Sequence, residues 1–170
     1  MNITIQQISE SQKSVLRQLI ELYEYDFSEY NDQDLNEYGF YGYSYLDYYW
    51  TEPGRVPLFI MADGKYAGFV LVNEHCYFDK AQGSRSIAEF FVMRKYRKKG
   101  IGHQVAAMVF DELPGHWEVA VHPENHGSRS FWQKVVTSYT RGQYEVQDVQ
   151  TEDWKGTAFL FQSGLQAADA

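Results

Sequence analysis

The sequence of 170 residues has a single cysteine, Cys76, only four prolines, and no apolar run long enough to span a membrane. One cysteine cannot form a disulfide within the chain, which excludes disulfide-stapled folds and fits a reducing compartment. The first residues, MNITIQQISE, lack the charged start and the apolar stretch of a secretory signal. We therefore expect a cytoplasmic protein that does not associate with membranes.

Positive charge is missing from one segment. No Lys or Arg occurs between Arg17 and Arg55, whereas nine carboxylates and nine tyrosines fall there. The rest of the chain holds 14 acidic and 15 basic side chains, so the formal net charge of −8 comes from this segment. An acidic, aromatic segment suits a cationic partner, and the alternative is a solubilising surface with tyrosines as core filler. The overall charge argues against nucleic acid as a partner.

The apolar pattern predicts a single mixed α/β domain over residues 1–170, because the length suits one hydrophobic core. Apolar runs predict strands at 3–9, 56–62, 65–72, 86–93, 116–121, 144–149 and 157–162. Helical spacing predicts helices after the cap Ser9, over 43–50, from Gly100, and from the cap Asn125. The pair Asp63-Gly64 predicts a hairpin turn. We expect a central sheet of about six to seven strands, flanked by about four helices.

A basic turn stands out in this acidic chain. The stretch RKYRKKGIGHQ, residues 94–104, has five cationic side chains in six positions, followed by Gly100 and Gly102. The cations repel one another unless an anion is bound. The glycines permit positive φ and close backbone approach, and the first N–H groups of the following helix suit a phosphate. A Rossmann site would have a third glycine where Val105 stands, and the G-K-[ST] of a Walker loop is missing.

Two segments in this context carry a family resemblance: EFFVMRKYRKKGIGHQVAAMVF at 89–110 and HPENHGSRSFWQKV at 122–135. They resemble the cofactor segments of the GNAT superfamily of acyl-CoA-dependent N-acyltransferases, and most resemble a subgroup of predicted acetyltransferases with EFFV and PEN…FW motifs. The resemblance implies a GNAT-like fold, N-acetyltransferase activity and acetyl-CoA as co-substrate, without a metal. By analogy with similar proteins it also suggests a homodimer.

The resemblance assigns cofactor contacts residue by residue. Phe91 and Val92 would pair through their backbones with the pantetheine arm, and the Val92 N–H would face the thioester carbonyl. Asn125 would contact the pantetheine or the adenosine, and Lys98, Lys99 or Arg94 would reach the 3′-phosphate. The pyrophosphate would be wrapped by Arg97, Lys98, Lys99, Gly100, Ile101, Gly102 and His103.

In this family an amine attacks the thioester directly, so a base must remove its proton. Glu89 and Glu118, on successive predicted strands, stand where relatives place a carboxylate base. The alternative for each glutamate is that it serves only as a hydrogen-bond partner or as a surface charge. We expect at least one of the two to be functional.

Trp132 departs from the family pattern, because many relatives have a tyrosine acid there, seven residues after the Asn. An indole N–H does not usefully give up its proton, and we expect Trp132 to pack in the core. Either no acid is needed, since a thiol with a pKa of about 8.5 leaves tolerably as thiolate, or Tyr139, Tyr96 or Ser130 serves.

The acidic tyrosine-rich segment predicts a small cationic amine as acceptor, such as a polyamine, an amino sugar or a basic peptide end. Two other functions remain open. One is a non-catalytic acyl-CoA-binding module, which Trp132 motivates, and the other is a nucleic-acid-associated protein that uses residues 94–99. A zinc site at His122 and His126 is not expected, because Pro123 and the cap at Asn125 prevent a shared helical face.

Overall fold

The computed structural model describes residues 1–152 and 154–164. Its strands are β1 (Ile3–Gln7), β2 (Val56–Ala62), β3 (Lys65–Asn73), β4 (Arg85–Val92), β5 (Gly115–Val121), β6 (Glu145–Gln150) and β7 (Lys155–Ser163). Its α-helices are α1 (Lys13–Asn31), α2 (Tyr48–Thr51), α3 (Ile101–Glu112) and α4 (His126–Thr140), with short 3₁₀ helices η1 (Glu10–Gln12) and η2 (Arg94–Tyr96). Residue 153 and the tail at 165–170, which belong to the predicted domain, lie outside the described residues.

The described strands form one mixed sheet in the order β1-β2-β3-β4-β5-β7-β6. All neighbours are antiparallel except β4 and β5, which are parallel. The expectation of a mixed α/β domain with about seven strands and four helices is confirmed. Asp63 and Gly64 have φ of 49° and 74° between β2 and β3, which confirms the predicted hairpin turn.

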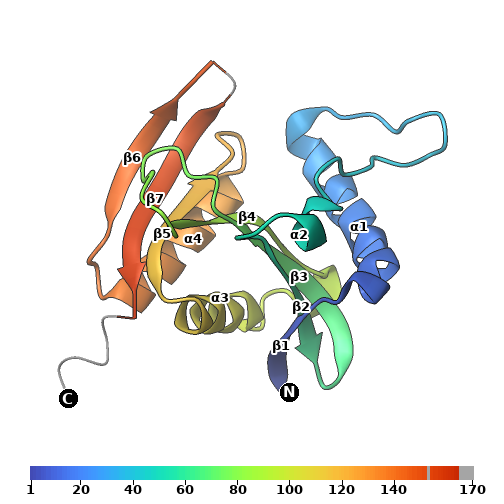
Figure 1. Cartoon of the computed structure of the whole chain (residues 1–170), viewed down its shortest axis with the longest axis horizontal. Coiled ribbons are helices and arrows are strands. Elements are labelled where there is room, and N and C mark those ends of the chain that lie inside the picture. Colours follow the sequence, from blue (N-terminus) through green and yellow to red (C-terminus); the bar gives the residue numbers. More distant parts are fainter. Residues whose placement is uncertain (153, 165–170) are drawn as a thin grey trace.

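The sheet is covered on both faces (Figure 1), with α1 and α2 on one side and α3 and α4 on the other. Alternate residues of β3 enter the two apolar layers. Val70 and Val72 pack toward α3 and α4, whereas Phe69 and Leu71 pack toward α1 and α2. A central strand buried on both faces accounts for the continuous apolar run seen in the sequence.

Two helices differ from the sequence expectation. Ser9 does begin the first helical segment, but its capping box closes the 3₁₀ turn η1, and α1 starts only at Lys13. The helix expected over 43–50 is reduced to α2, since most of 44–47 forms turns. Residues 32–47 therefore form a long connection, which Glu21 fastens to α1 by accepting the N–H groups of Tyr41 and Gly42 at 2.8 and 2.9 Å.

The parallel pair β4–β5 comes apart in the middle of the sheet. The two strands pair at Arg85↔Trp117 and Ser86↔Glu118, and then each continues without pairing to the other. Because Leu71 pairs with Glu89 and Val72 with Ile87, Ala88 is an extra residue of β4, a bulge that bends the strand. The divergence leaves one edge of β4 open beside the start of α3.

None of the helices in the described parts of the chain combines the length and the apolar character that a membrane crossing requires.

Candidate active site

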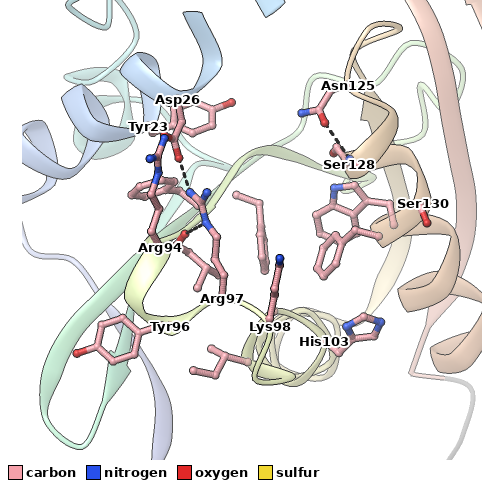
Figure 2. Close-up of a pocket in the computed structure, with 18 of the residues that line it drawn as sticks. Tyr23, Asp26, Arg94, Tyr96, Arg97, Lys98, His103, Asn125, Ser128 and Ser130 are labelled. Atoms are coloured by element: carbon pink, nitrogen blue, oxygen red, sulfur yellow. Dashed lines mark hydrogen bonds and ion pairs between the residues drawn. The ribbon is translucent and has the colours of Figure 1, made fainter. Parts of the chain in front are cut away.

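A cavity of about 940 Å³ lies at the end of β4, between the second half of α1 and the first turns of α4. Its wall comes from four places: the end of β4, the turn from η2 into α3, the first turns of α4, and the second half of α1. Figure 2 shows Asp26 and the arginines on one side of this cavity and Asn125 with α4 on the other. Every residue that the family resemblance assigned to the cofactor lines the cavity except Lys99, which is exposed and lies outside the wall.

The two glycines of the basic turn have different structural roles. Gly100 has a φ of 76°, in the left-handed region that favours glycine, and a Cβ there would point into open space. Gly102 is within α3, where a Cβ would lie 2.9 Å from the Phe131 ring of α4. The first glycine therefore shapes the turn, and the second allows α3 and α4 to approach closely.

The first turn of α3 presents backbone N–H groups at the cavity. The first intrahelical hydrogen bond of α3 runs from the Gln104 N–H to the Gly100 carbonyl. The N–H groups of Ile101, Gly102 and His103 therefore precede the helical ladder, and these residues line the cavity. Together with the helix dipole they form an anion site of the kind that binds phosphates.

Arg97 is held at the wall by contacts that the sequence did not reveal. Its Nε donates to the Val92 carbonyl at 2.6 Å, its guanidinium pairs with Asp26 of α1, and it lies 5.5 Å from the Phe91 ring. Arg94 donates to the other Asp26 oxygen at 2.7 Å. Partial burial raises the pKa of Asp26, but the two arginines outweigh it and hold that pKa below its ordinary value. Asp26 thus links α1 to the basic turn.

Asn125 caps α4, as the sequence predicted. Its side-chain oxygen accepts the Ser128 N–H at 2.9 Å, and both residues line the cavity (Figure 2). Because the oxygen is used by the cap, a ligand contact from Asn125 would come from its amide nitrogen.

Glu89 lies directly behind the cavity wall. It is partly exposed, and its two oxygens accept hydroxyl groups from Tyr23 of α1 at 2.5 Å and Tyr43 at 3.2 Å. Burial raises the pKa of Glu89 to about 7, although the tyrosine hydrogen bonds act in the opposite direction. Tyr23 itself lines the cavity. The structure therefore brings to the site a carboxyl group that exchanges its proton near neutral pH.

Glu118 has a different environment. Its side chain is buried, 1% exposed, and its carboxylate accepts the backbone N–H groups of Tyr77, Phe78 and Asp79 at 2.6, 3.0 and 3.3 Å. It lies outside the cavity wall and fixes the connection that follows β3. Of the two carboxylates that the sequence offered, the structure brings Glu89 to the cavity and places Glu118 in a structural role.

Trp132 packs in the core, as expected. It is 4% exposed and meets Phe90 edge-on at 5.0 Å between ring centroids, while one side of it lines the cavity. Of the alternative acids, Tyr96 and Ser130 line the cavity. Tyr139 does not line it, and its hydroxyl donates to Asp111 at 2.6 Å.

Tyr23 and Asp26 are the site residues that sequence reasoning missed. The sequence places both in the acidic, tyrosine-rich segment, and the family resemblance assigns neither of them to the site. Their spacing of three positions, which places both on one helical face, was the available signal.

Across residues 1–152 and 154–164, no three His, Cys, Asp or Glu side chains come together as metal ligands would.

Comparisons with known structures agree with this geometry. An aminoglycoside acetyltransferase, AAC(6')-Ib, solved with coenzyme A, is 13% identical with a TM-score of 0.67, and 95% of each chain is covered. An acetyltransferase from Thermus thermophilus is 10% identical with a TM-score of 0.68, covering 95% of this chain and 97% of the other. YncA of Salmonella typhimurium, solved with its cofactor acetyl-CoA, is 15% identical with a TM-score of 0.62, covering 99% and 98%. At these identities the likeness concerns the fold.

No protein of curated function matches the sequence. The family model described as the acetyltransferase (GNAT) family matches residues 16–136, well over half of the chain. The matched range contains most of α1, β4, the basic turn and most of α4, which together build the cavity. The chain belongs to the GNAT family of acetyltransferases.

Proposed function

We propose that this protein transfers an acetyl group from acetyl-CoA to the primary amine of a small cationic acceptor. The observation that carries the proposal is the cavity at the end of β4. Its wall combines Arg97 and the first N–H groups of α3 with Tyr23, whose hydroxyl donates to Glu89. A pocket of about 940 Å³ is large enough for an extended ligand.

The residues present suit coenzyme A. Its pyrophosphate fits the start of α3, where Gly100 has no side chain to obstruct it. Its pantetheine arm fits the open edge of β4, where Phe91 and Val92 line the cavity. A backbone N–H of Val92 directed at the thioester carbonyl would stabilise the oxyanion that forms during attack. Structural neighbours whose complexes contain coenzyme A or acetyl-CoA support this assignment.

Glu89 supplies the base. An alkyl amine has a pKa of roughly 10.4 and is protonated near neutral pH, so a proton must leave before the nitrogen attacks. A carboxylate with a pKa of about 7 is ionised often enough to take that proton and basic enough to hold it. Glu118 does not share this role, because three backbone N–H groups occupy it outside the wall.

The acceptor side of the cavity is acidic and aromatic. Glu29, Phe27 and Tyr30 of α1 line it, and Glu24 is buried on the same helix. Burial and the nearby Glu21 raise the pKa of Glu24 to about 7. A cationic amine would relieve this accumulation of negative charge and would stack on the rings. Neighbouring structures of an aminoglycoside acetyltransferase solved with kanamycin or ribostamycin support a cationic acceptor.

The second candidate is a non-catalytic acyl-CoA-binding module of the same fold. The observation in its favour is Trp132, since the first turns of α4 place an indole at the wall where a proton donor would be useful. The two candidates differ in whether bound acetyl-CoA is consumed when an amine is present.

The test is thiol release from acetyl-CoA across polyamines, amino sugars, amino acids, arylamines and short peptides, with a control lacking acceptor. Turnover concentrated in one cationic class supports the proposal, and the acetylated amine should be identified by mass. A Glu29→Gln variant should raise KM for a diamine and leave KM for a neutral amine unchanged. Acetyl-CoA binding without amine-dependent release would favour the binding module instead.

A further inference from the structure

We propose that Tyr23 carries the proton between the reacting atoms and Glu89 in both directions, and is the acid that protonates the departing thiolate. This inference rests on the proposed acetyl transfer. It assigns the role of proton-donating acid, which Trp132 does not fill although many relatives have a tyrosine acid at its position.

The reaction needs a proton path with two ends. The amine nitrogen gives up a proton as the N–C bond forms, and the thiol of free coenzyme A, with a pKa of about 8.5, is protonated near neutral pH. A protonated acceptor first loses one proton, which Glu89 passes on to solvent, and acetyl transfer from the resulting neutral amine then moves a second proton from nitrogen to sulfur. Glu89 has the proton affinity to hold it in between, but Glu89 is behind the wall, so another group must make the contact.

The opposite wall does not offer that group. On α4 the cavity meets the rings of Phe131 and Trp132, which do not act as proton acids. Ser130 of α4 also lines the cavity, but Figure 2 shows its hydroxyl pointing away from the labelled side chains on the other side. Tyr96 is 7% exposed and packs in the core, and Figure 2 shows its ring pointing away from the labelled side chains across the cavity.

Tyr23 belongs both to the wall and to the hydrogen bond with Glu89. Its ring is fixed by three aromatic neighbours: Phe27 stacked at 5.7 Å, and Phe69 and Phe91 edge-on at 5.8 and 5.9 Å between centroids. The ring is therefore held in one place, with its hydroxyl bonded to Glu89, and Tyr23 is the member of this pair that lines the cavity. Tyr43 bonds the other Glu89 oxygen but lies outside the wall, which gives the comparison needed for a test.

The charges around the pair favour this sequence of events. Burial raises the pKa of the Tyr23 hydroxyl, and the charges of Glu89 and, to a smaller extent, Glu24 raise it further. Burial and the charge of Glu89 also raise the pKa values of Tyr43 and Tyr49, and the positive charge of Arg55 partly offsets the rise for Tyr49. Once Glu89 is protonated its negative charge is gone, so Tyr23 becomes a stronger acid only after the amine proton has arrived.

The steps balance. The amine nitrogen forms the N–C bond and passes a proton to the Tyr23 oxygen while the Tyr23 proton moves to Glu89. The C–S bond then breaks and its electron pair stays on sulfur. Tyr23 gives its proton to sulfur and receives the one held by Glu89. The products are the acetylated amine and the thiol, and both side chains return to their initial states.

The test compares three matched variants with the wild type. Tyr23→Phe removes the hydroxyl at the wall, Tyr43→Phe removes the hydroxyl on the other Glu89 oxygen, and Tyr25→Phe removes an exposed hydroxyl on the same helix. We expect Tyr23→Phe to lower kcat by about 10²- to 10⁴-fold with KM for acetyl-CoA within about threefold. Tyr43→Phe should lower kcat by less than about tenfold, and Tyr25→Phe should match the wild type. Thermal melting and coenzyme A binding verify that each variant is folded.

A second readout separates an acid from a residue that only positions Glu89. With an acetyl-CoA analogue whose thiol is more acidic, the leaving group needs less help, so the defect of Tyr23→Phe should shrink while that of Tyr43→Phe stays constant. An equal defect with both donors, or a Tyr23→Phe kcat within about threefold of wild type, overturns the role of Tyr23. Failure of the wild type itself to release thiol with any amine overturns the proposed acetyl transfer, and the proton path with it.

Discussion

Glu89 and Glu118 are on neighbouring parallel strands, yet their surroundings differ in every respect that matters for chemistry. Glu118 is at the last position where β4 and β5 still pair, and its oxygens accept three backbone N–H groups. Glu89 is three residues beyond that point on β4, past the bulge, and its oxygens accept two tyrosine hydroxyls. The point of divergence separates a carboxylate that holds the fold from one that contacts the cavity wall through Tyr23.

We infer that the kind of hydrogen-bond donor around each glutamate determines whether its carboxylate can exchange a proton. Backbone N–H groups do not give up protons, and three of them hold the Glu118 carboxylate in place. Tyrosine hydroxyls exchange protons, and the burial of Glu89 keeps its charged and neutral forms close in free energy near pH 7. Four substitutions test this account of the site, and they follow in order of decreasing expected effect.

The largest expected effect is on turnover. Glu89→Gln keeps the shape of the side chain and removes the proposed base, so kcat should fall by about 10²- to 10⁴-fold while the melting temperature changes little. Amine-dependent thiol release measures it. Glu89→Gln turning over like the wild type would remove Glu89 from the mechanism.

The next effect is on stability. Glu118→Gln replaces one acceptor oxygen by an amide nitrogen, which leaves N–H groups of the 77–79 segment without their acceptor. We expect the free energy of unfolding to fall by about 2–3 kcal/mol, with kcat of the folded enzyme within about threefold of wild type. Urea unfolding gives the first quantity. A stable Glu118→Gln with lost turnover would reverse the assignment of the two carboxylates.

The third effect concerns the phosphate end. Arg97→Gln removes a guanidinium at the wall and should weaken coenzyme A binding by about 10- to 100-fold. Lys95→Gln makes the same change of charge at an exposed position of the same turn, and its affinity should stay within about threefold. Calorimetry with coenzyme A compares them. Equal losses would mean that the turn acts only through its total charge.

The smallest effect is on the pH dependence of stability. In the folded state the pKa of Glu24 is raised from 4.5 to about 7, so the folded protein holds this proton more tightly than the unfolded chain. The stability that follows is fully present below about pH 4.5 and is lost as the pH rises through about 7. Glu24→Gln should therefore raise the free energy of unfolding by about 1–2 kcal/mol near pH 8 and change it little near pH 4. Urea unfolding at both values checks the sign, which a decrease near pH 8 would contradict.

Local patterns predicted most of the fold and the place of the basic turn at the start of α3, where it lines the cavity. The alternating runs, the Asp63-Gly64 turn, the cap at Asn125 and the basic turn all act over a few residues, and the structure has each of them. The pattern did not show that β7 inserts between β5 and β6, because the two strands carry similar signals.

The chemical end depends on contacts between distant residues. Tyr23 meets Glu89 across 66 positions, and Glu118 meets Tyr77 across 41. Nothing in the neighbourhood of either glutamate distinguishes a proton-exchanging partner from a backbone partner. The sequence could therefore name both carboxylates and could not choose between them.

The most direct test of the account is the pH dependence of kcat at saturating acetyl-CoA and amine. If Glu89 is the base, kcat should rise with pH through an inflection near 7, since only the ionised carboxylate takes the proton. The inflection should be lost in Glu89→Gln and kept in folded Glu118→Gln. A wild-type profile without an inflection near 7, or one that survives unchanged in Glu89→Gln, would contradict the central claim that Glu89 receives the proton of the amine.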